Sequence, residues 1–116
     1  MKKLNLPLEY PNIRNVKVND SFISPLLEKI AKITLKDVWQ KYENDGTERN
    51  FLNIANGEGR DEFFGTPWQD GMIYEIIRGG SDLFTEYPDS ELESSFERYI
   101  SEAARAQAAA FMLRKI

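Results

Sequence analysis

Three acidic side chains lie close together in a glycine-containing stretch of the sequence: Glu58, Asp61 and Glu62. Carboxyl pairs hydrolyse glycosidic bonds when two of them, about 5–9 Å apart, act on opposite sides of the bond and burial keeps one of them protonated. Glycines among charged residues are typical of an irregular, exposed loop. We therefore expect these three carboxylates to be solvated rather than catalytic.

Three aromatic residues follow in the same stretch: Phe63, Phe64 and Trp68. A flat aromatic face can stack on a sugar ring, so Trp68 is a candidate for substrate binding. Large aromatic side chains also anchor loops to the core beneath them. The sequence favours anchoring for this group and leaves stacking by Trp68 as the alternative.

The polar candidates for substrate binding are Gln69, Asp70 and Arg49. Gln69 and Asp70 stand at the start of a helical pattern, where aspartate is a favoured N-cap, so capping is the ordinary interpretation of Asp70. Arg49 and Glu48 precede a short apolar pattern, where an ion pair or a cap is the ordinary interpretation. Carbohydrate binding is the alternative in each case.

The sequence contains no cysteine and no histidine. Cysteine-based zinc sites, thiol nucleophiles, Ser-His-Asp triads and histidine general bases are therefore excluded within the chain. Carboxylates, lysines, tyrosines and hydroxyls are the groups that remain for chemistry. We predict no catalytic residue and no metal ligand among these 116 residues.

The charge pattern limits the classes of partner. The formal net charge is −4, and lysines and arginines are scattered rather than clustered, which argues against nucleic acid as a partner. No apolar stretch is long enough to span a membrane, and residues 4–9 are too short and polar for the core of a signal peptide. We expect a cytoplasmic protein that binds neither nucleic acid nor membrane.

The elements that carry these residues are predicted to be helices. Residues 1–23 form an extended lead-in with strand-like alternation at 16–20. A first helical run begins with Ser24 as N-cap and Pro25 at the first helical position, and it ends at Gly46. A break near Thr34, which would give two short helices instead of one, is the alternative.

The remaining helical patterns are shorter or contain glycine. A helical turn is predicted around 51–55, and a longer helix opens at Asp70. That helix contains Gly79 and Gly80, each of which costs roughly 1 kcal/mol against alanine and is tolerated where another helix crosses closely. Asp89 caps a final helix, and the short link makes these two helices antiparallel neighbours.

An ordered succession of segments resembles glycoside hydrolase family 127, a group of β-L-arabinofuranosidase-like enzymes with a helical toroid catalytic domain. The resemblance runs from residue 15 to residue 107. Its central stretch is Phe64-Gly65-Thr66-Pro67-Trp68-Gln69-Asp70-Gly71, which continues to Gly79. The flanking segments are 16–18 with Asp20, Phe22 and Pro25, then 34–35, 49–51, 87–92, 99–100 and 104–107.

The resemblance implies an all-α fold: a partial (α/α) toroid of about four helices after a short N-terminal extended segment. Residues 24–116 would be an incomplete helical segment of an (α/α)6-type catalytic domain. Family members usually continue after the equivalent of Gln107 with an Asp-Gly-Tyr-Leu turn, whereas alanines follow here. The family's usual tryptophan near the first proline is Ile23 here.

The resemblance also implies a catalytic apparatus: a cysteine nucleophile near a zinc ion, a glutamate acid/base and several substrate-binding histidines. These groups lie downstream of the matching region, so the implied zinc would be bound by residues not present here, and we expect no cofactor in this chain. In similar toroids the loop between the first helices lies near the substrate. Gln69 and Asp70 would then stand at the mouth of the sugar site.

The predicted function is therefore the N-terminal helical segment of a β-L-arabinofuranosidase-like glycoside hydrolase, inactive alone. Helices that line the inside of a ring would expose an apolar face, which self-association or the remainder of the domain would have to cover. The alternative is a free-standing helical module for interaction or dimerisation, because the last helix is rich in alanine and ends in Phe111-Met112-Leu113. A weaker alternative is a sugar-binding remnant that uses Trp68.

Overall fold

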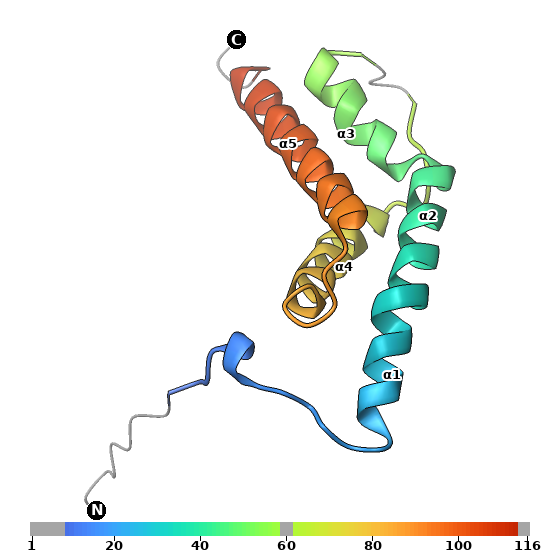
Figure 1. Ribbon diagram of the computed structural model, residues 1–116. Helices are drawn as coiled ribbons and strands as arrows, with labels where there is room; N and C mark the ends of the chain where they lie inside the picture. The colour runs from blue at the N-terminus through green and yellow to red at the C-terminus, as the bar shows by residue number, and fades with distance from the viewer. Residues whose placement is uncertain (1–8, 59–61, 114–116) are drawn as a thin grey trace, which may run out of the picture.

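The computed structural model describes residues 9–58 and 62–113, and over these residues the protein is helical with no strand (Figure 1). The all-α prediction is confirmed. The elements are the 3-10 turn η1 (Ile13–Asn15), α1 (Ile23–Lys29), the π-helical segment η2 (Ile30–Thr34), α2 (Leu35–Asp45), α3 (Thr47–Asn56), α4 (Gln69–Leu83) and α5 (Ser90–Leu113). The strand-like alternation at 16–20 forms no strand: this stretch follows η1 as non-helical backbone that begins extended at Val16.

Helices α1, η2 and α2 form one continuous rod from Ile23 to Asp45. The break predicted near Thr34 is therefore a π-helical segment rather than an interruption. The predicted Ser24 cap is wrong. Asp20 does the capping, because its Oδ1 accepts the free N–H groups of Phe22, at 2.7 Å, and Ile23. The Ser24 hydroxyl instead donates to the Val18 carbonyl at 2.8 Å.

A sharp corner joins α2 to α3 at Gly46, whose φ of 83° lies in the left-handed region that favours glycine. This confirms the predicted end of the first helical run. Helix α3 then runs over ten residues, so the single turn predicted at 51–55 was too short. Figure 1 shows the change of direction at this corner.

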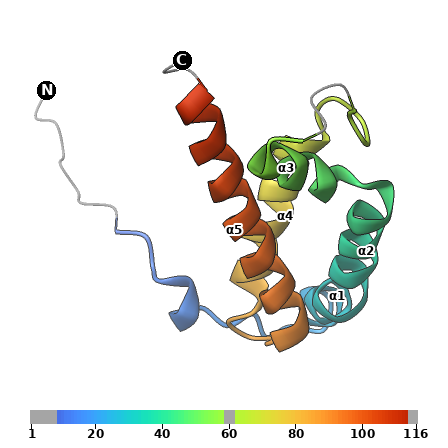
Figure 2. The same cartoon turned by 90° about the horizontal axis from the view of Figure 1, so that it is seen from above.

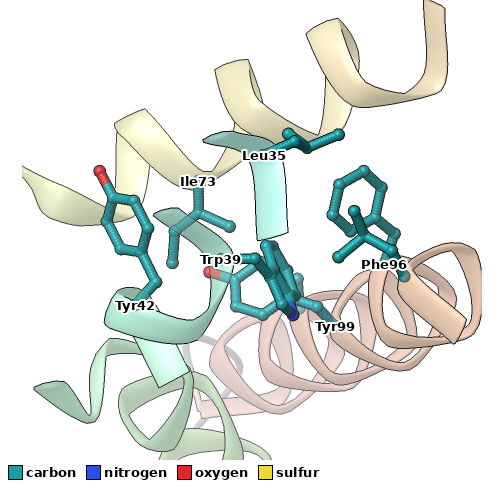
Figure 3. Close-up of a cluster of buried hydrophobic side chains, with 8 residues drawn as sticks. Leu35, Trp39, Tyr42, Ile73, Phe96 and Tyr99 are labelled. Atoms are coloured by element: carbon teal, nitrogen blue, oxygen red, sulfur yellow. The ribbon is translucent and has the colours of Figure 1, made fainter. Parts of the chain in front are cut away.

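The hydrophobic core lies between α2, α4 and α5 (Figure 3). The Trp39 ring centroid is 4.7 Å from that of Phe96 and 6.0 Å from that of Tyr99. The stripe predicted for the last helix is confirmed in its first half, where Leu92, Phe96, Tyr99 and Ala103 are buried. It is wrong for the other predicted members, which are exposed: Ile100, Ala104, Gln107, Ala108 and Phe111. The core residues are Leu35, Trp39, Tyr42, Ile73, Leu92, Phe96, Tyr99 and Ala103.

Helix α5 contacts both α3 and α4, but in opposite senses. The predicted antiparallel arrangement with α4 is confirmed, since Tyr74 near the start of α4 lies 6.4 Å from Tyr99 and Phe84 after its end lies 5.4 Å from Phe96, ring centroid to ring centroid. Helix α3 instead runs parallel to α5 (Figures 1 and 2). Arg105 near the end of α5 donates to Asn56 at the end of α3, at 3.0 Å.

The start of α5 is capped as predicted. The Asp89 carboxylate accepts the N–H of Leu92 at 3.1 Å, and Lys36 of α2 forms an ion pair with it at 2.7 Å. The hydrogen bonds from Lys36 and from the Leu92 backbone hold the pKa of Asp89 below its ordinary value of 3.8. Its charge therefore stabilises the fold above pH 3.8, and this contribution is lost only as the pH falls through the lowered pKa.

The two adjacent glycines of α4 have different surroundings. A Cβ atom on Gly80 would lie 2.6 Å from Phe96 Cε2 and 3.1 Å from Leu35 Cδ2. A Cβ atom on Gly79 would meet nothing within 4 Å among the described residues. The predicted close helix crossing is confirmed at Gly80 and wrong at Gly79.

Gly80→Ala is expected to lower the free energy of unfolding by about 1–3 kcal/mol, because overpacking against Phe96 outweighs alanine's better helix propensity. Gly79→Ala is the matched control and is expected to raise the free energy of unfolding by about 0.5–1 kcal/mol, since it brings the same propensity into open space. Urea unfolding measures both values. Shifts of the same sign would contradict the close contact at Gly80.

Candidate functional site

A depression of about 430 Å3 lies at the corner where α2, α3 and α5 meet. Its charged lining residues are Glu43, Asp45, Glu48, Arg49, Arg98 and Glu102. Helix α2 contributes its last turn, α3 its first turn, and α5 one face near its middle. The depression therefore exists because the glycine corner folds α3 back along α5.

Asn50 fastens the following loop to α3 beside this depression. Its side-chain Nδ2 donates to the Phe64 carbonyl at 2.8 Å, and its Oδ1 accepts the Phe64 N–H at 2.9 Å. Asn50 is only 8 % exposed, so its side-chain amide, rather than water, pairs with the backbone N–H and carbonyl of Phe64. The Phe64 Cβ also packs against the Cα side of Gly46, and the Arg49 guanidinium lies 5.0 Å from the Phe64 ring centroid.

The predicted substrate-binding residues fall in two places. Arg49 lines the corner depression, whereas Trp68 stands just before α4, does not line that depression, and is 70 % exposed. Gln69 and Asp70 are the first two residues of α4, and their side chains lie outside what the structure describes. The structure therefore does not bring Arg49 and Trp68 into one depression.

The capping role predicted for Asp70 is wrong. Helix α4 begins at Gln69, two residues earlier than an Asp70 cap would place it, so the N-cap position belongs to Trp68, whose side chain makes no capping hydrogen bond. Asp70 is the second residue of the helix.

The loop before α4 confirms some sequence expectations and corrects others. Phe64 is anchored as predicted, but Phe63 and Trp68 are exposed, so the anchoring interpretation is wrong for these two. The exposure of Glu58 and Glu62 confirms their solvation, whereas Asp61 lies outside the described residues.

A charge network spans the corner. Arg98 of α5 forms ion pairs with Glu43 of α2, at 2.8 Å, and with Glu48 of α3. Glu43 also accepts the indole N–H of Trp39 at 3.2 Å, which ties the network to the core. Sequence reasoning paired Glu48 with its neighbour in the chain, but its partner is on another helix. Burial raises the pKa of Glu48 above its ordinary value of 4.5, Arg98 opposes the rise, and Glu102 and Glu43 add to it.

The donor atoms of this chain do not fit the zinc ion that the resemblance implies. The sequence has no cysteine or histidine, and within residues 9–58 and 62–113 no three metal-ligating side chains gather into a group. The corner depression instead offers charges of both signs for hydrogen bonding.

No helix among the described residues is long and apolar enough to cross a membrane.

Comparison with known proteins gives a family but no individual relative. The searches of curated proteins and of solved structures each returned no match. Residues 15–112, most of the chain, match the family described as β-L-arabinofuranosidase, GH127 catalytic domain. This extent agrees with the all-helical fold and with the segments that resemble the family in sequence. The chain therefore belongs to the β-L-arabinofuranosidase family, GH127 catalytic domain.

Proposed function

We propose that this chain is a structural segment of a GH127-type catalytic domain, inactive alone. The catalytic groups and the zinc would come from helices outside these 116 residues. The observation that carries the proposal is a family match over 15–112 in a sequence without cysteine or histidine. The cytoplasmic location stays a prediction from the sequence.

The apolar surface of the helices supports a role within a larger body. Ile33 on η2 and Ile100 and Met112 on α5 are all exposed. Figure 1 shows the rod of α1 and α2 on one side of the helices and α5 on the other, with α3 and α4 between them. A segment of a helical ring has neighbours at both of its edges, and exposed apolar residues lie on both of these outer elements.

The solvent-accessible surface and the radius of gyration of the chain also support a role within a larger domain. The chain exposes 9404 Å2, against about 6,500 Å2 for a compact monomer of its mass. Its radius of gyration is 18.8 Å, against about 13 Å for a compact domain of this length. Part of the excess comes from the arm at 9–22, which is exposed along nearly all of its length. The exposed apolar side chains of α1, η2 and α5 are part of this surface, and a larger domain would bury them at about 25 cal/mol per Å2.

The candidate sugar-facing residues of this chain are Trp68, Gln69 and Asp70, at the turn into α4. Trp68 supports this part of the proposal because its ring is exposed rather than packed on the core. Arg49, which lies against Phe64 in the corner depression, would bind a sugar only if the ligand reached the α2–α3 corner.

The purified chain is expected to release no arabinose from a β-L-arabinofuranoside and to bind the apolar dye ANS strongly. Met112→Ser with Ile100→Ser should reduce dye binding, whereas Ser94→Ala with Ser101→Ala, at exposed polar positions of the same helix, should not. Sugar release by the chain alone would overturn the proposal. A stable dimer in light scattering that no longer binds the dye would instead support the free-standing interaction module.

A further inference from the structure

Helix α3 is attached to the fold differently from α2, α4 and α5. Over residues 9–58 and 62–113, the buried core is built from those three helices and takes no residue from α3. The buried residues of α3 are polar, and each is hydrogen-bonded outside α5: Thr47 to Asp45, and Asn50 to Phe64. Phe51 is the partly buried residue through which α3 packs against the core. Removing α3 from α5 would therefore leave the core itself in place.

Two arginines of α5 hold the two ends of α3, which lies alongside α5 in Figure 1. Arg98 forms ion pairs with Glu48 in the first turn of α3 and, at 2.8 Å, with Glu43 in the last turn of α2. Arg105 donates to Asn56 at the end of α3, at 3.0 Å. Arg98 therefore joins three helices, because different nitrogens of one guanidinium contact the two carboxylates.

A glycine in the left-handed backbone region stands at each end of α3. Gly46 precedes the helix with a φ of 83°, and Gly57 follows it with a φ of 74°. Glycine moves between backbone regions at less steric cost than other residues, so both positions are suitable hinges. An isolated helix of ten residues is marginal in water, so α3 should lose its helical hydrogen bonds once it leaves α5.

We infer that α3 is a flap that opens about Gly46 while the core stays folded, and that Arg98 is the latch that keeps it closed. Elements with few buried apolar contacts open in this way before the rest of a domain unfolds. Opening separates the walls of the corner depression, because α3 supplies one wall and α5 another. Arg49 and the Phe64 backbone bound to Asn50 move with the flap. The opening depends on contacts within this chain and not on the role proposed above.

Native-state hydrogen–deuterium exchange of the full chain, at urea concentrations well below the unfolding transition, tests the flap. The hydrogen-bonded amides of α3 should exchange together and faster than the α5 amides around Phe96 and Tyr99. Their exchange should also depend less on urea, because opening α3 exposes less surface than global unfolding does. If the amides of α3 and α5 shared one rate and one urea dependence, the flap would be overturned. This measurement needs no variant.

Arg98→Gln tests the latch in the same experiment. It removes the charge that pairs with Glu43 and Glu48, so the amides of α3 should exchange about tenfold faster, as expected for charged hydrogen bonds lost at a partly exposed site. Arg98→Lys keeps the charge without the planar fork and should restore part of the protection. Arg78→Gln is the matched control, because it removes an exposed ion pair with Glu75 within α4 and should leave the exchange of α3 unchanged. An unchanged rate for α3 in Arg98→Gln would overturn the latch.

Discussion

Phe96→Ala is expected to lower the free energy of unfolding by about 3–5 kcal/mol, the range for removing a buried phenylalanine from a core. Phe96 is 2 % exposed, and its ring contacts Trp39 on one side and Phe84 on another. It also packs against the open face of Gly80. Its removal therefore weakens the contacts that join α2, α4 and α5 at one point. Urea unfolding followed by Trp39 fluorescence measures the loss.

Met112→Ala on the same helix is the matched control. Met112 is 66 % exposed, so its truncation is expected to change the free energy of unfolding by no more than about 0.5 kcal/mol. A double-mutant cycle sharpens the result: Gly80→Ala should be less destabilising in the Phe96→Ala background, because the deleted ring leaves room for the added methyl group. Equal effects of Phe96→Ala and Met112→Ala would contradict the core.

Asn50→Ala is expected to lower the free energy of unfolding by about 2–4 kcal/mol, because it leaves both the N–H and the carbonyl of Phe64 without their partner. Thermal unfolding measures the loss. The loop around Phe64 should also become more sensitive to limited proteolysis, since the amide is what fastens it to α3.

Asn44→Ala is the control for this substitution. Asn44 is exposed, and its side chain accepts one hydrogen bond from Gln40, at 3.2 Å, on the same helix. Its loss is expected to change stability by about 0.5 kcal/mol or less. If Asn50→Ala were as mild as Asn44→Ala, with no change in cleavage, the Asn50 amide would not be what holds the loop.

Features set by short-range chemistry were predictable from the sequence. Gly46 ends α2 because few other residues adopt its backbone conformation readily, and Asp89 caps α5 because its carboxylate reaches an N–H three residues ahead. The buried stripe of α5 follows from the spacing of Leu92, Phe96 and Tyr99. In each case the information lies within a few residues of the element that it determines.

The starts of α1 and α4 were predicted at the wrong capping residues. Asp20 and Ser24 are both good capping residues, and the sequence does not rank two such residues four positions apart. Asp20 caps α1 because the chain bends so that its carboxylate reaches two free N–H groups. The preference of aspartate for the N-cap position also gave the wrong start for α4, because this helix begins before Asp70.

Contacts between distant segments could not be predicted from one sequence. The parallel packing of α3 on α5 brings together Arg98 and Glu48, which are far apart in the chain. Asn50 was missed as a structural residue because an asparagine in a short helix ordinarily faces water. The only signal was its place next to Phe51 in a segment that resembles the family. The predicted substrate-binding roles of Arg49, Trp68, Gln69 and Asp70 stay predictions.

The π-helical segment between α1 and α2 acts as a phase shift within one rod. Its wider turn accommodates about one extra residue, and each residue turns an α-helix by about 100°. The residues of α1 are thereby rotated away from the face of α2 that carries Leu35, Trp39 and Tyr42, and α1 buries none of its own. A single continuous helix can thus keep one end in this core while its other end presents apolar side chains such as Ile23 and Leu26 at the surface.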